Sequence, residues 1–222
     1  MRSSACVASA RRGAREREGV ETKRNGSCRA RAARIPGLML RRGLNLVLIH
    51  PNIPGNTGCI GRTAVATGSR LHLIHPLGFS LDEKAVKRAG LDYWPQLDLT
   101  EHDSWEAFLR SESEAAGGRP PRAWLFTTHA RTSGRPHWNA SMRAGDYLLF
   151  GSETAGAPDA VHSWVQSTWG EEHRVCLPMV PEARSINLST AVGAAVFEAT
   201  RQVAAAEALE ASFRRLGVDM NS

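Results

Sequence analysis

From Leu44 onward the sequence alternates short apolar runs with longer stretches of helical spacing, and this alternation restricts the fold more than any other feature. Apolar runs of strand length occupy 44–49, 71–75, 123–127, 146–150 and 173–177. Strands that alternate with helices favour a parallel sheet whose faces are covered by the helices. The sequence therefore predicts an α/β fold with a parallel sheet flanked by helices.

The segments between these runs carry helix and turn signals. A helix is expected over 57–67 with Gly68 as its stop, and a second begins after Ser104 as its cap. Pro158 favours the first turn of another helix. The remaining expectations are a short helix at 82–89, a weak strand at 96–99, a surface loop at 111–122 and a long last helix at 187–209.

Residues 1–43 differ from the rest of the chain, because they hold eleven Arg and one Lys against three Glu, a net charge of +9. The remaining residues carry −3 of the total of +6. We expect 1–43 to be a disordered extension, 44–210 a single domain and 211–222 a tail. A transit peptide and an RNA-binding arm are alternatives for the extension, as is an upstream start codon with Met39 as the natural start.

The cysteines and the hydropathy argue against several classes of protein. The four cysteines show neither C-x-x-C pairing nor a regular framework, so we expect no metal site and no disulfide scaffold. No apolar run approaches the roughly 18 residues of a membrane span. A cytoplasmic protein without a membrane anchor is expected. His50, His75 and His129 follow strands without a Cys or carboxylate at catalytic or metal spacing, so they receive no catalytic role.

Polar residues gather where the predicted strands end. They occupy 51–57, Thr127 and Thr128, 151–153 and 178–187. Because ligands of open parallel sheets bind beyond the carboxyl ends of the strands, these four segments are expected to converge on one site.

Three polar residues in or close to these segments are candidates for function. Asn56 lies near a helix start, where an N-cap is its ordinary role. Arg62 lies on a mostly apolar helix, which favours a paired anion or an RNA phosphate. Glu153 lies between Gly151 and Gly156, where it could pair with Arg62, hold a ligand or cap a helix.

Taken together, three motifs resemble those of the SpoU branch of the SPOUT RNA methyltransferases. They are Asn56-Thr57-Gly58 with Arg62, the segment 150–158, and Leu177-Pro178-Met179 with 185–189. The flanking residues are similar to the small TrmL-type enzymes, which methylate the ribose of the tRNA wobble nucleotide. The resemblance extends over 44–203.

This resemblance implies a deep C-terminal trefoil knot, S-adenosylmethionine as cofactor, a homodimer, and the anticodon loop of tRNA as partner. It places cofactor contacts on Phe126, Gly151, Leu177 and Ser185, and the polar residues of the motifs on Asn56, Arg62, Glu153 and Asn187. Implied activity is 2′-O-methylation of cytidine or uridine 34. The alternatives are another tRNA or rRNA position, or a non-catalytic RNA-binding module.

Two departures from the family pattern accompany the motifs. Ala157 replaces a larger apolar residue, and His129-Ala130 stands where Lys-Gly is usual. RNA phosphates would meet the basic residues Arg70, Lys84, Lys87, Arg88, Arg131 and Arg135.

Overall fold

The computed structural model describes residues 43–81, 93–131 and 135–215, all within the unit Ile35–Ser222. The predicted extension up to residue 42, the expected helix at 82–89 and the last residues of the tail lie outside these ranges. So do Lys84, Lys87, Arg88 and the side chain of Arg131. No helix among the described residues combines the length and the apolar character that a bilayer span requires.

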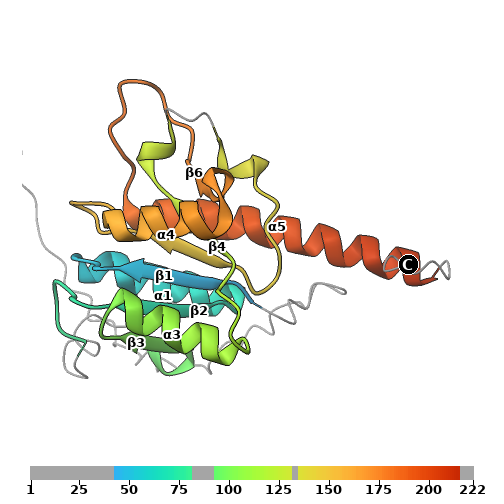
Figure 1. Ribbon diagram of the computed structural model, residues 1–222, viewed down its shortest axis with the longest axis horizontal. Coiled ribbons are helices and arrows are strands. Elements are labelled where there is room, and N and C mark those ends of the chain that lie inside the picture. The colour runs from blue at the N-terminus through green and yellow to red at the C-terminus, as the bar shows by residue number, and fades with distance from the viewer. Residues whose placement is uncertain (1–42, 82–92, 132–134, 216–222) are drawn as a thin grey trace, which may run out of the picture. The chain divides into compact units, whose positions relative to one another are not determined.

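The centre of the fold is a parallel sheet with strand order β3-β2-β1-β5-β4-β6 (Figure 1). The strands are β1 (Asn45–Ile49), β2 (Arg70–Ile74), β3 (Leu99–His102), β4 (Ala123–Phe126), β5 (Tyr147–Phe150) and β6 (Arg174–Val175), and all but β3 coincide with apolar runs of the sequence. The central strand β1 pairs with β2 on one side and with β5 on the other, so Val47 lies between His72 and Leu149. The predicted parallel sheet flanked by helices is confirmed.

Side chains that alternate along the strands form two separate hydrophobic cores, one on each face of the sheet. One face packs against α1 (Pro54–Thr67) and α5 (Leu188–Arg215), which also contact each other. The other face packs against α3 (Trp105–Ala115) and α4 (Asp159–Trp169). Every second residue of a strand points to the same face, so both cores are built from the same short runs.

Helix ends follow their local sequence. Pro54 occupies the first turn of α1, and Gly68 ends that helix with φ of 64°, a conformation that favours glycine. Ser104 caps α3 as predicted, because its hydroxyl accepts a hydrogen bond from the Ala107 N–H. Pro158 lies at the cap of α4, one residue before the helix begins.

Several boundaries differ from the sequence prediction. Helix α1 begins at Pro54 and not at residue 57, because Pro54 starts its first turn. The strand expected at 96–99 lies at Leu99–His102, because Trp94–Gln96 forms a 3-10 turn around Pro95. Helix α3 continues to Ala115 and shortens the loop predicted at 111–122. The last strand is only Arg174–Val175. Helix α5 extends to Arg215 and projects beyond the sheet in Figure 1. The deep trefoil knot stays a prediction.

Candidate active site

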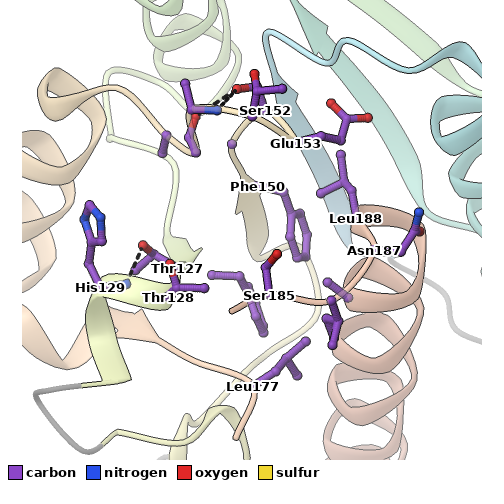
Figure 2. A pocket seen from close by; sticks show the side chains of 18 of the residues that line it. Thr127, Thr128, His129, Phe150, Ser152, Glu153, Leu177, Ser185, Asn187 and Leu188 are labelled. Atoms are coloured by element: carbon purple, nitrogen blue, oxygen red, sulfur yellow. Dashed lines mark hydrogen bonds between the residues drawn. The ribbon is translucent and has the colours of Figure 1, made fainter. Parts of the chain in front are cut away.

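A pocket of about 840 Å³ lies beyond the carboxyl ends of β4, β5 and β6 and next to the start of α1. All four polar segments predicted from the sequence contribute to its wall. They supply Ile53 and Asn56, the stretch 126–129, the stretch 150–157, and residues between Cys176 and Ala191. Figure 2 shows Phe150, Leu177 and Ser185 between the two polar sides of this pocket.

The four residues expected to contact a cofactor all line the pocket: Phe126, Gly151, Leu177 and Ser185. The rings of Phe126 and Phe150 stack at 4.9 Å between centroids and provide a flat apolar wall. Gly151 lets the backbone of the next turn approach closely, because a Cβ there would lie 2.0 Å from the Ala157 nitrogen. The pocket therefore joins an apolar slot to exposed backbone.

Three of the four expected motif side chains form a continuous hydrogen-bonded chain at the pocket. The amide of Asn187 donates to Asn56 Oδ1 at 2.9 Å, and the amide of Asn56 donates to Glu153 Oε1 at 2.9 Å. These residues come from the start of α5, the first turn of α1 and the loop after β5. Asn56 is buried and is not the helix cap that the sequence predicted, because Ile53 occupies that position.

Glu153 is held as a carboxylate by this arrangement. Its burial opposes ionisation, but hydrogen bonds from the Asn52 N–H, the Asn56 amide, its own N–H and the Ile53 N–H hold its pKa below the ordinary value. The negative charge lies at the N-terminal end of α1, where the helix dipole also favours an anion. Glu153 fixes the loop before α1 against the loop after β5.

Arg62 occupies a different place. It lies on the exposed side of α1, and it is not among the residues that line the pocket. Its guanidinium carbon is 4.6 Å from the centroid of the Tyr93 ring, a cation–π contact. The hydroxyl of Tyr93 in turn donates to the Gly58 carbonyl of α1. A single copy of the protein therefore brings Asn56, Glu153 and Asn187 together at the pocket, whereas its Arg62 lies outside that pocket.

Other side chains line the pocket that the sequence analysis did not assign to a site. His129 follows β4, His162 comes from α4, and Arg184 lies in the exposed loop before α5. A His or Arg without a motif partner gives no sequence signal, although the departure at His129 marked the position. His75, for which the sequence showed no carboxylate at catalytic or metal spacing, pairs with Glu101 at 2.9 Å.

The residues expected to meet RNA phosphates differ in their surroundings. Arg70 forms an ion pair with Asp98 at 3.0 Å, so part of its charge is already compensated. Arg135 is exposed, and its backbone carbonyl accepts from the Cys176 N–H next to the pocket. Arg135 is the better placed of the two to contact a ligand near the pocket.

A second polar cluster is buried between β2, β3 and α3. Nitrogen and oxygen atoms of His72, His102 and Glu112 that could ligate a metal lie within 4.8 Å of one another. His72 Nδ1 and His102 Nε2 are 3.0 Å apart in rings only 19° from parallel, with centroids 5.3 Å apart. The two nitrogens therefore face each other head-on, as in an N–H···N hydrogen bond. Tyr147 donates to Glu112 at 2.6 Å, and the other carboxylate oxygen of Glu112 lies 3.9 Å from His72 Nδ1.

Comparison with known proteins agrees with this geometry. The model of the SpoU rRNA Methylase family matches residues 43–197, a range that contains the whole pocket. The chain belongs to the SpoU rRNA Methylase family. Its relatives include the tRNA (cytidine(34)-2'-O)-methyltransferase of Burkholderia ambifaria, 46% identical over 71% of this chain and 94% of the relative. The Escherichia coli protein of the same name is 44% identical over 72% and 94%.

Solved structures of SpoU-type proteins share the fold. One that concerns the 2-OH methylation of C/U34 on tRNA has a TM-score of 0.62 and 43% identity, and the match covers 72% of this chain and 96% of the other. The SpoU methyltransferase AviRb from Streptomyces viridochromogenes, in complex with the cofactor AdoMet, has a TM-score of 0.60 and 27% identity. That match covers 72% of this chain and 60% of AviRb.

Proposed function

We propose that this chain methylates the ribose 2′-oxygen of nucleotide 34, a cytidine or uridine, in the anticodon loop of tRNA, with S-adenosylmethionine as methyl donor. The observation that carries the proposal is the chain of hydrogen bonds from Asn187 through Asn56 to Glu153 at the pocket. Relatives that match 94% of their own length and carry this activity in their names support the choice of substrate.

The pocket fits the proposed cofactor in size and character. Its volume of about 840 Å³ is ample for a nucleoside with an amino-acid side chain, and the stacked Phe126 and Phe150 rings suit an adenine. Backbone exposed beside Gly151 and Leu177 can recognise the edge of a base by hydrogen bonds. We therefore assign cofactor binding to Phe126, Gly151, Leu177 and Ser185.

When bound, S-adenosylmethionine supplies a methyl group that is already activated by a sulfonium. The work left to the chain is to orient the ribose 2′-hydroxyl and to assist loss of its proton. Alignment of this kind contributes on the order of 7–11 kcal/mol in well-oriented cases. Asn56 and Asn187 are hydrogen-bonded to each other, so their amides stay fixed in the wall of the pocket.

Glu153 supports this arrangement as a positioning residue. Its two carboxylate oxygens already accept hydrogen bonds from Asn52, Ile53 and Asn56. A carboxylate with these partners and a lowered pKa is a poor proton acceptor. Arg62 is the better candidate to bind a phosphate or stabilise the developing alkoxide, because a guanidinium stays charged at neutral pH.

A homodimer would explain how Arg62 can act in the reaction although it lies outside the pocket of its own chain. The exposed side of α1 holds Cys59, Arg62 and Ala66, and the neighbouring α5 exposes Ala194 and Phe197. Phe197 is 61% exposed, which is unusual for a large aromatic side chain on a helix. We propose that a second copy of the chain covers this face of α1 and α5, and that Arg62 serves the pocket of that copy.

The test is a genetic one, with a chemical readout. Expression of this chain in Escherichia coli deleted for its own tRNA (cytidine(34)-2'-O)-methyltransferase is expected to restore the 2′-O-methyl group at position 34. Nucleoside mass spectrometry of purified tRNA measures it. Methylation at another tRNA or rRNA position would redirect the substrate assignment, and absence of any new methyl group would favour a non-catalytic RNA-binding protein.

A further inference from the structure

Two imidazoles form part of the pocket wall on the side away from the Asn–Glu chain. His129 belongs to the 3-10 turn after β4, and His162 lies on α4. Their rings stack with centroids 5.2 Å apart and 26° between the planes. Figure 2 shows His129 beside Thr127 and Thr128, across the pocket from Glu153 and Asn187.

The local backbone holds His129 in this position. Its N–H donates to Thr127 Oγ1 at 3.2 Å, and the Thr127 N–H donates to the Val175 carbonyl of β6. Burial, then the charge of Arg174 and the His129 ring, lower the pKa of His162, although Asp159 and Glu171 oppose this. A neutral imidazole still carries one N–H donor. This side of the pocket thus offers N–H and hydroxyl donors.

The two sides of the pocket therefore differ in charge character. Glu153 is an anion on one side, whereas the opposite side presents imidazoles and the hydroxyls of Thr127 and Thr128. S-Adenosylmethionine also carries charges of both signs. It bears a sulfonium, an ammonium and a single anionic group, the α-carboxylate. An anion is disfavoured beside Glu153 and favoured near donors.

From this arrangement we propose that His129 and His162 form the subsite for the α-carboxylate of the methionine part of the cofactor. The inference rests on the proposed function, since it assumes that S-adenosylmethionine occupies the pocket. It assigns a role to the position where His129 replaces the Lys that is usual in this family. In this chain the donors to the carboxylate would be imidazole N–H groups and a threonine hydroxyl.

Arg184 is the competing candidate, because it also lines the pocket and carries a permanent charge. It is exposed in the loop before α5, two residues from Glu182 and two residues from exposed Ile186. His162, in contrast, is half-buried on a regular helix and forms a fixed part of the wall, and the exposed His129 is held against it by ring stacking. A group at the exposed mouth suits an RNA phosphate, whereas a group within the wall suits the small molecule.

The experiment compares two ligands by isothermal titration calorimetry of the full chain. S-Adenosylhomocysteine carries the carboxylate, and its decarboxylated analogue keeps the thioether, the ammonium and the adenosine. The variants are His129→Ala, His162→Asn and Arg184→Ala, with His75→Ala as a control that removes an imidazole paired with Glu101 outside the pocket. Comparing two ligands on one variant cancels any general loss of folded protein.

In each pocket histidine variant, binding of S-adenosylhomocysteine is expected to weaken about tenfold, because a hydrogen bond to a charged group is lost. Binding of the decarboxylated analogue is expected to weaken by less than about twofold. Arg184→Ala and His75→Ala should leave the ratio of the two dissociation constants unchanged. Equal weakening of both ligands in the histidine variants would overturn the inference, as would a selective loss in Arg184→Ala.

An RNA phosphate at the imidazoles is tested with the same proteins. If His129→Ala weakens binding of tRNA but keeps the wild-type ratio for the two small ligands, the carboxylate assignment is wrong. If the wild-type chain binds neither small ligand, the proposed function itself fails. If it binds both equally and still methylates tRNA, the function stands and only the subsite is refuted.

Discussion

The side-chain amide of Asn187 donates to Asn56 Oδ1 at 2.9 Å and so joins two positions 131 residues apart in the sequence. The oxygen of the same Asn187 side chain accepts from the N–H groups of Ser189 and Thr190 and caps α5. Asn187 therefore ends the loop before α5 and connects it by a hydrogen bond to the start of α1. Asn56 passes the connection on to Glu153.

This double role can be separated by two substitutions. Asn187→Ala removes both the cap and the link to Asn56, whereas Asn187→Ser keeps an oxygen for the cap. We expect Asn187→Ala to lower the free energy of unfolding by about 1 kcal/mol and Asn187→Ser to lower it much less. Both should reduce single-turnover methylation by at least roughly tenfold, because neither reaches Asn56. A wild-type rate in Asn187→Ser would show that the link does not serve the reaction.

Glu153→Gln tests the carboxylate brace through its pH dependence. In the folded chain the pKa of Glu153 is below its ordinary value of 4.5, so the carboxylate adds stability that is present above that value. This contribution is lost as the pH falls through the folded pKa. Urea unfolding is expected to show wild type more stable than Glu153→Gln at pH 7, by about 1 kcal/mol or less because solvent screens the partly exposed carboxylate, with the difference shrinking below pH 4.5. A gap that widens on acidification would contradict this account.

Gly151→Ala tests the close approach of backbone at the pocket. The added Cβ would lie 2.0 Å from the Ala157 nitrogen and from the Gly156 carbonyl carbon, so the loop after β5 must move. We expect at least about tenfold weaker binding of S-adenosylhomocysteine by calorimetry. Gly193→Ala is the matched control, because its Cβ meets nothing within 4 Å, and it should bind normally. Similar affinity in all three proteins would remove the loop after β5 from the cofactor site.

Arg62→Ala tests whether one chain serves the pocket of another. The variant should fold and bind S-adenosylhomocysteine like wild type, since Arg62 lies outside the pocket, but should lose methyl transfer. Mixed dimers of Arg62→Ala with Asn187→Ala should recover activity, because one pocket then has Asn187 intact and receives Arg62 from the other chain. No recovery after verified exchange of chains would mean that Arg62 acts within its own chain.

Most of the sheet could be predicted because β1, β2, β4 and β5 are runs of mainly apolar residues too short for a helix and followed by polar loops. The meeting of four loops followed from the shared direction of parallel strands. The start of β3 could not be predicted, since Trp94 and Pro95 close a 3-10 turn that delays it. The end of α3 was missed because its last turn is polar and resembles a loop.

Within the site, motif spacing placed Asn56, Glu153 and Asn187, but it did not show what they contact. The position of Asn56 near a predicted helix start indicated an N-cap, whereas its hydrogen-bond partners Glu153 and Asn187 lie far away in sequence. The pairing of His129 with His162 depends on the packing of α4 against the end of β4, which no local pattern encodes. Long-range pairs of single residues require the three-dimensional structure.

The most direct measurement is methyl transfer by the purified chain to an unmodified tRNA with cytidine or uridine at position 34, followed by mass spectrometry of nuclease fragments. A matched tRNA with a 2′-deoxyribose at position 34 is the control, because it lacks the accepting oxygen. The account predicts one methyl group on the ribose of nucleotide 34 and none on the deoxy control. Methylation of a base, of another nucleotide, or of the deoxy control would contradict it.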